Sequence, residues 1–208
     1  GGMDNPAAGI GTGAYKVEVD EPGVRHSAVR NENDWDPDRG YADSVEILVI
    51  NDATARTAAL QGGQVDMINR VEPKIVDLVK RVPGVTIQNV AGRGHYVMIM
   101  HTNTGPFDNN DLRMSLKYAI DRQEMVDKIL RGYGTIGNDL PINASYPLFD
   151  ASIPQREHDL DKAAFHYKKS GHDGSPIVLR TADAAFPGAV DASALLQQSA
   201  AKVCAHSC

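Results

Sequence analysis

The 208-residue sequence lacks most features that identify membrane proteins, nucleic-acid-binding proteins and enzymes. No apolar run approaches the roughly 18 residues that a membrane-spanning helix needs, and the start of the chain has neither the basic nor the apolar region of a signal peptide. The net charge of -6 leaves no basic excess to neutralise phosphates, so we expect no nucleic-acid partner. The G-x-S-x-G, H-E-x-x-H and C-x-x-C motifs are also missing. These absences predict a protein that is not an enzyme and holds no cofactor.

Cysteine and histidine are too sparse or too scattered to indicate a metal site. The only cysteines, Cys204 and Cys208, lie at the carboxyl end. A disulfide between them would close a very small loop, and a metal site that added His206 would lack the usual spacing and a fourth ligand. None of the seven histidines pair at the i, i+4 spacing of a helix. We predict no metal site, and a metal-dependent hydrolase that uses these histidines is the remote alternative.

The first half of the sequence alternates between strand and helix signals. Alternating apolar residues on both sides of a Glu21-Pro22-Gly23 turn predict a β-hairpin. Strand signals at 45–50 and 65–68 flank a helix signal at 53–61, with Asn51 or Asp52 as its cap. This pattern predicts a β-α-β unit whose two strands are parallel. The other elements expected here are a helix at 74–81 and strands at 85–90 and 96–100.

The most informative stretch runs from residue 92 to 122. Tyr96–Met100 is an unbroken apolar run of strand length, which predicts a strand covered on both faces. It ends at a polar crossing, and Gly105-Pro106 prevents the continuation of either regular structure. One of the polar residues at 108–110 can then cap a helix. A strand, a crossing and a new helix predict a chain that leaves one lobe and enters another.

Helical spacing dominates the second half. The elements expected there are helices at 110–120, 122–130, 160–170 and 189–203, a strand at 177–180, and a long irregular surface loop at 134–159.

The stretch from Asn103 to Gly134 resembles the peptide/nickel family (family 5) of bacterial extracellular solute-binding proteins, which serve ABC importers. The matching residues are Asn103, Pro106-Phe107-Asp108, Asp111, Arg113, Leu116, Tyr118-Ala119-Ile120-Asp121-Arg122, Val126, Ile129-Leu130 and Gly132-Tyr133-Gly134. Residues 11–15 (GTGAY) and 45–68 are similar to the family as well. The resemblance implies an α/β fold, as part of the two-lobed periplasmic-binding-protein (type II, Venus-flytrap) fold, with mixed sheets flanked by helices.

The resemblance also implies a domain organisation. Residues 1–103 would form part of lobe I, and residues 104–208 would form the opening part of lobe II. The chain would then be an internal fragment, without the N-terminal and C-terminal portions of the family fold. The expected location is periplasmic or cell-surface, with the signal peptide absent from this fragment.

The function implied by the resemblance is that of the substrate-binding component of an ABC transporter. Such a protein captures a small peptide or peptide-like solute between two lobes and delivers it to the permease subunits in the membrane. The alternative is a non-transport sensor or scaffold domain of the same fold that binds a protein partner.

The candidate ligand-binding residues lie where strands are expected to end. Ligands of open α/β sheets bind beyond the carboxyl ends of the strands, and clefts between lobes are common small-molecule sites. The candidate cleft or hinge residues are Asn69, Arg70, Tyr96, Met98, Met100, His101 and Asn103. Each also has a structural alternative: the methionines as core residues, Tyr96 as a hairpin anchor, His101 as a cap of hinge backbone groups, and Arg70 as a surface ion-pair partner.

Overall fold

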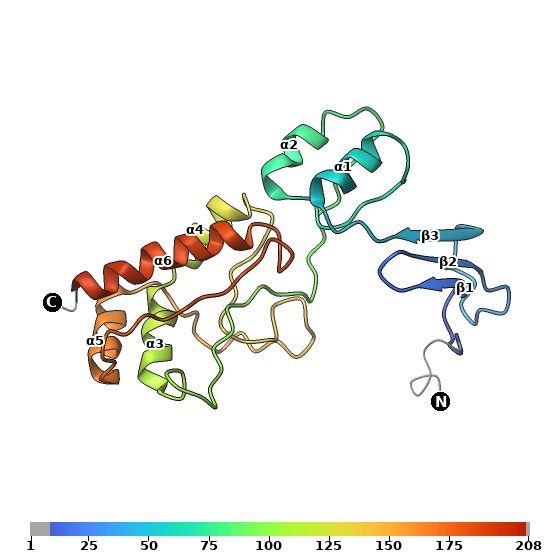
Figure 1. Ribbon diagram of the computed structural model, residues 1–208. Helices are drawn as coiled ribbons and strands as arrows, with labels where there is room; N and C mark the ends of the chain where they lie inside the picture. Colours follow the sequence, from blue (N-terminus) through green and yellow to red (C-terminus); the bar gives the residue numbers. More distant parts are fainter. Residues whose placement is uncertain (1–8, 207–208) are drawn as a thin grey trace. The chain divides into compact units, whose positions relative to one another are not determined.

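The computed structural model describes residues 9–206, and it describes the side chains of residues 9–203. The chain divides into two compact units, Gly1–Met67 and Ile68–Cys208 (Figure 1). Among the helices of the described residues, none is both long and apolar enough to cross a membrane. The expected lobe boundary between residues 103 and 104 stays a prediction.

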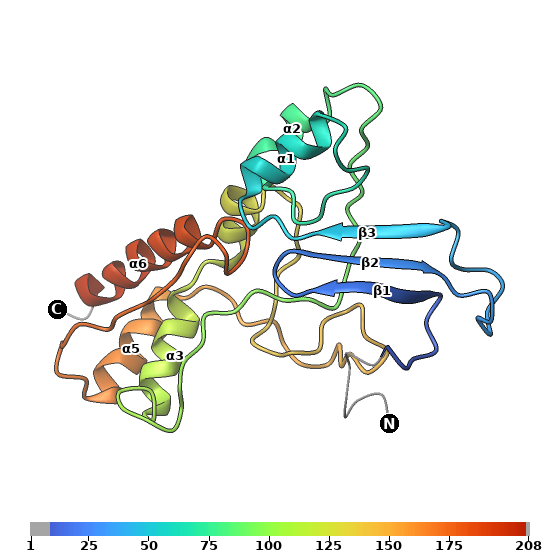
Figure 2. The same ribbon diagram turned by 45° about the vertical axis from the view of Figure 1, so that its right-hand side comes forward.

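The first unit is built on an antiparallel sheet in the order β1-β2-β3, whose strands run side by side in Figure 2. The strands are β1 (Tyr15–Glu21), β2 (Arg25–Arg30) and β3 (Ser44–Leu48). Helix α1 (Ala53–Gln61) follows, and Asp52 caps it by accepting a 2.7 Å hydrogen bond from the Ala55 amide. The predicted hairpin, third strand and capped helix are therefore confirmed.

The predicted β-α-β unit with parallel strands is wrong. Residues 65–68 form no strand, and β3 pairs with β2 in antiparallel register, with Val45 opposite Ala28. The short 65–68 segment covers little apolar surface, since Met67 is 85% exposed. The edge of β3 that faces away from β2 is free in this sheet, but a strand is stabilised by side-chain packing against its neighbours, and this segment buries too little apolar surface to pair there.

The second unit is helical within the described residues. Its elements are η2 (Pro73–Ile75), α2 (Val76–Val79), α3 (Asn110–Ala119), α4 (Arg122–Glu124), η3 (Met125–Ile129), α5 (Leu160–Ser170) and α6 (Ala189–His206). The helices predicted at 110–120, 160–170 and 189–203 are confirmed. The two shorter predictions are only partly right, because residues 73–79 begin with a 3-10 turn and residues 122–129 continue as a π-helix.

Helices α3, α5 and α6 enclose the core of this unit, and α3 and α5 lie side by side in Figures 1 and 2. Ala119, Ala163 and Val203 are buried in the core, where small side chains let helices approach closely. The partly buried residues packed against them are Tyr118, Leu160, Ala164 and Tyr167. Ser199 of α6 is buried too, and its hydroxyl donates a hydrogen bond to the Ala119 carbonyl. This bond ties α6 to the end of α3.

Two polar contacts hold α3 and α5 as antiparallel neighbours. Asn109 caps α3 by accepting a 3.2 Å bond from a first-turn amide, and its Nδ2 donates to the Ser170 carbonyl at 2.8 Å. At the other end, the Asp159 amide donates to the Tyr118 carbonyl at 3.0 Å. Asn109 is therefore the cap predicted among residues 108–110, and it also joins the two helices.

The strands predicted at 85–90, 96–100 and 177–180 do not form. These segments are outside every helix and strand, and none of them pairs with a described residue in a ladder. Contrary to the prediction of two covered faces, Val97 and Ile99 are exposed, while Met98 and Met100 are half-buried. The alternation of exposure is that of an extended chain, but a strand also needs a neighbour that accepts its hydrogen bonds.

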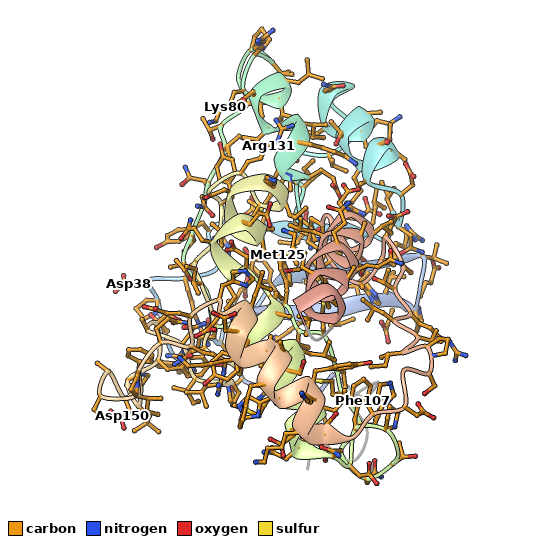
Figure 3. All side chains as sticks on the ribbon, turned by 90° about the vertical axis from the view of Figure 1, so that its left-hand side faces the viewer. Asp38, Lys80, Phe107, Met125, Arg131 and Asp150 are labelled. Carbon is orange, nitrogen blue, oxygen red and sulfur yellow. The ribbon has the colours of Figure 1, made fainter. Side chains whose placement is uncertain are left out.

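Residues 134–159 form the predicted irregular loop, and polar contacts at its base hold it in place. Asn138 Nδ2 donates to the Pro154 carbonyl at 3.0 Å, and Asn138 Oδ1 accepts from the Arg156 amide at 2.8 Å. Asp150 lies at the outer end of the loop (Figure 3). The two ends of the loop are thus joined by hydrogen bonds of the Asn138 side chain, and not by the backbone pairing of a sheet.

Candidate functional site

The second unit contains an open groove with a volume of about 680 Å³. Its first wall is the extended segment 95–99 with His101 and Phe107, and its second wall is the segment 178–181. The lining is completed by Ala185 and Phe186, which precede α6, and by Ser193 within α6.

The long loop positions the start of the first wall. Asn143 Nδ2 and Ser145 Oγ donate to the Gly92 carbonyl at 3.3 and 3.0 Å. The Tyr146 hydroxyl donates to the Arg93 carbonyl at 3.2 Å, and the Arg93 guanidinium lies 5.0 Å from the centre of the Tyr146 ring. The wall begins two residues later, at His95. Side chains of the loop therefore fix a segment that has no sheet partner of its own.

The far end of the first wall is held by α3. Arg113 Nη1 donates two hydrogen bonds, one to the Phe107 carbonyl at 2.5 Å and one to the Asp108 carbonyl at 3.1 Å. Phe107 is half-buried and its ring reaches the groove (Figure 3 labels this residue). The arginine of the family-like motif thus has a structural role here, since it orients the turn that carries Phe107.

The second wall begins beyond the end of α5. Gly171 ends the helix in the left-handed conformation, with φ of 67°. His172 Nε2 lies 3.0 Å from the Ser175 carbonyl oxygen, and the Ser175 amide donates to Asp173 Oδ1 at 2.9 Å. These contacts turn the chain, which then runs extended through residues 178–181.

A close helix approach fixes the groove end of α6. Gly188 has φ of 81°, and a Cβ placed on it would lie 2.5 Å from a side-chain methyl of Ile129 in η3. Only glycine fits this position without movement of η3 or α6. Phe186, two residues earlier, accepts the amide hydrogen bond of Ala189 at 3.0 Å and is thereby held at the start of the helix.

An aromatic pair joins the first wall to the segment that precedes α6. The rings of Tyr96 and Phe186 are stacked with centroids 4.5 Å apart and an interplanar angle of 11°. Such a pair contributes about 0.5–1.5 kcal/mol beyond its area burial. Tyr96 is still 54% exposed, so part of the pair's apolar surface is open in the groove.

The structure brings together three of the predicted site residues: Tyr96, Met98 and His101 line the groove. Met100 is half-buried and Asn103 is exposed, and neither lines it. Asn69 and Arg70 lie in an exposed bend and are not part of the lining either. Whether any of these residues contacts a solute stays a prediction.

The other lining residues were not among the candidates from the sequence, and they include His95, Phe107, Arg180 and Phe186. Arg180 ends an apolar run just as His101 ends the run 96–100, so the rule that selected His101 selects Arg180 as well. Phe186 carries no comparable signal, because its position depends on the packing of α6.

The described side chains include no group of three or more His, Cys, Asp or Glu residues that could hold a metal ion. Cys208 lies outside the described residues, and the side chains of Cys204 and His206 lie outside the described side chains.

The model of the family "Bacterial extracellular solute-binding proteins, family 5 Middle" matches residues 1–204. Heme-binding protein A of Haemophilus influenzae is 28% identical over 165 residues, which are 78% of this chain and 29% of that protein. Di/tripeptide-binding protein 1 of Pseudomonas aeruginosa is 25% identical over 173 residues, which are 82% of this chain and 32% of that protein. The chain therefore spans about a third of the length of these relatives.

Solved structures show the same fold. NikZ of Campylobacter jejuni, in complex with Ni(L-His), superimposes with a TM-score of 0.74 at 18% identity, over 93% of this chain and 41% of that chain. DppA of Helicobacter pylori, in complex with the peptide STSA, gives a TM-score of 0.70 at 20% identity, over 93% and 37%. The predicted α/β fold, as part of a two-lobed periplasmic-binding-protein fold, is thereby confirmed. Because the family model extends over nearly all of its residues, this chain belongs to family 5 of the bacterial extracellular solute-binding proteins.

Proposed function

We propose that the protein containing this chain is the substrate-binding component of an ABC transporter, which captures a peptide-like solute and delivers it to the membrane permease. The observation that carries this proposal is the open groove of the second unit, with its stacked Tyr96–Phe186 pair and apolar walls. Concave, mostly apolar sites with a few polar groups are typical of small-molecule binding. Family membership gives the setting, since the family consists of extracellular solute-binding proteins.

Unpaired backbone favours a peptide-like solute. No backbone hydrogen bond joins residues 95–103 or residues 176–181 to another described residue. An extended peptide can pair with such segments as an added strand, while pockets beside the strand select its side chains. Among the relatives, the names of the di- and tripeptide-binding proteins and the STSA complex refer to peptides, and other names refer to heme and nickel.

We propose further that the protein binds its solute outside the cytoplasm and does not change it chemically. The solute is bound outside the cytoplasmic membrane and released unchanged, so the protein acts without a catalytic step. The metal-dependent hydrolase alternative finds no support in the groove, whose lining contains two imidazoles, His95 and His101, and no carboxylate.

Calorimetric unfolding with and without pooled di- to hexapeptides tests this function. A solute that binds only the folded chain, at a hundredfold excess over its dissociation constant, adds about 2.7 kcal/mol to the free energy of unfolding. For a chain of this size we expect the midpoint to rise by about 5–10 °C with at least one pool. A cooperatively unfolding sample with no shift in any pool contradicts the proposal. It would favour the sensor or scaffold alternative, which a shift with a protein partner would then support.

A further inference from the structure

We propose that the groove selects solutes that carry a carboxylate next to an apolar body, with Arg180 as the partner of the carboxylate. The Tyr96–Phe186 pair receives the apolar body. This inference rests on the proposed function, because it assigns a solute class to the same groove.

The charge of the groove points to an anionic group. The lining includes Arg180 and no Asp or Glu residue. Arg180 makes no hydrogen bond or ion pair with any residue that the structure describes. Arg70, Arg81 and Arg131 also have no side-chain partner among the described residues, but none of them lines the groove. Arg180 differs from these three arginines because it belongs to the lining of a groove that contains no acidic residue.

The chemistry of arginine narrows the anion to a planar oxyanion. The guanidinium presents N–H donors in a fixed fork that matches the two oxygens of a carboxylate. A basic solute group in the same place would meet a like charge and no carboxylate in the lining to compensate it. The groove therefore discriminates against solutes whose only charge is positive.

The surroundings of Arg180 strengthen this preference. The neighbouring lining residues Val178 and Leu179 are apolar, and Phe107 and the aromatic pair add further apolar surface. A solute body seated on these side chains excludes water from the ion pair, which raises its strength above that of a fully solvated pair. Because Arg180 is itself exposed, we expect the gain to be moderate, about tenfold in the dissociation constant.

Two matched pairs of probes separate a peptide from a non-peptide source of the carboxylate. The first pair is alanyl-phenylalanine and its C-terminal amide, and the second is 3-phenylpropionate and 3-phenylpropionamide. Dissociation constants are measured by titration calorimetry on the purified chain and on two variants, Arg180→Gln and Arg131→Gln. Both variants remove one positive charge, but Arg131 is outside the groove. Near-ultraviolet circular dichroism confirms that each variant is folded.

We expect each acid to bind about tenfold more tightly than its amide to the wild-type chain and to Arg131→Gln, and about equally with its amide to Arg180→Gln. If the peptide and its amide bind equally and Arg180→Gln changes nothing, the inference is overturned while the proposed function stands. If only 3-phenylpropionate shows the Arg180-dependent preference, the inference stands and the peptide function fails. If no probe binds the folded chain, both are overturned.

Discussion

The substitution Asp139→Asn tests how the long loop is held to the helices. Asp139 lies near the base of loop 134–159, and its carboxylate contacts Arg122 at 2.7 Å, Arg156 at 2.8 Å and Lys117 at 3.9 Å. One carboxylate thus joins α3, α4 and both ends of the loop base. Asp139 has φ of 57°, a left-handed conformation that asparagine adopts more readily than other residues. Asparagine therefore removes the charge without a new backbone strain.

The expected loss follows from the burial of the ion pairs. The side chains of Asp139, Arg122 and Arg156 are 21%, 12% and 24% exposed. Exposed ion pairs contribute about 0.2–1 kcal/mol, and removal of one partner from a buried pair costs about 3–5 kcal/mol. The exposure of these groups lies between that of a surface pair and that of a buried pair, and two arginines lose their counter-charge. We therefore expect Asp139→Asn to lower the free energy of unfolding by about 2 kcal/mol at pH 7.

The same network predicts how stability depends on pH. Burial raises the pKa of Asp139, but the hydrogen bond and charge of Arg122, followed by Arg156 and Lys117, outweigh it and place the pKa below that of a free aspartate. A lowered pKa stabilises the folded chain above the pKa of the unfolded state, near 3.9. This contribution is lost as the pH falls through the lower, folded-state pKa. The difference between wild type and Asp139→Asn should therefore shrink under acid conditions.

Urea unfolding at pH 7 and at a series of lower pH values measures both effects. With a slope of about 2 kcal/mol per molar urea, the predicted loss lowers the midpoint at pH 7 by about 1 M. Asp150→Asn is the matched control, because Asp150 lies in the same loop and, among the described residues, its carboxylate accepts hydrogen bonds from Ser152 alone. The control should change the free energy of unfolding by less than about 0.5 kcal/mol. Equal effects of the two substitutions, or a difference that is independent of pH, would refute the role assigned to Asp139.

Three further predictions concern the packing around the groove and the groove itself. Gly188→Ala should lower the free energy of unfolding by about 2 kcal/mol, because it adds left-handed strain and a contact with Ile129; urea unfolding checks this, and an unchanged midpoint would contradict it. Asn109→Ala should cost about 1–2 kcal/mol in the same assay, since it removes both the α3 cap and the bond to Ser170, while Asn109→Asp should recover the cap alone. Amides of residues 95–103 should exchange with solvent without protection in the free chain and become protected in the presence of a bound peptide; protection in the free chain would disprove the absence of backbone pairing.

The helices were predictable because their signals are local. The helix at 160–170 was predicted with its observed bounds, since Asp159 caps it and Gly171 ends it. Helix α1 was predicted from equally local signals, because Asp52 caps its start and Gly62 follows its last residue. In contrast, whether residues 65–68 form a strand depends on side-chain packing against a neighbouring strand, and the four-residue segment itself does not encode that packing.

The candidate site was predicted in part for the same reason. Tyr96, Met98 and His101 belong to one continuous apolar run and its polar end, which the sequence shows directly. Arg180 and Phe186 come from a distant part of the chain, and the packing of α6 against α5, α3 and η3 helps to bring that part to the groove. The sequence can therefore indicate each wall of the groove, because each wall contains an apolar run that ends at a polar residue. It does not indicate that the two walls lie next to each other.

The unpaired backbone and the side chains of the groove would contribute differently to solute binding. In the free chain, water satisfies the exposed N–H and C=O groups of the walls, so pairing them with a peptide exchanges one set of hydrogen bonds for another at a gain of about 1 kcal/mol each. Every peptide offers the same main-chain groups, and this contribution therefore cannot distinguish one solute from another. Discrimination must come from Arg180 and from the Tyr96–Phe186 pair, whose charge and apolar surface only some solutes match. The same exposed segments can pair with another copy of the chain, so a solute that binds well should also reduce self-association, which light scattering at increasing protein concentration would detect.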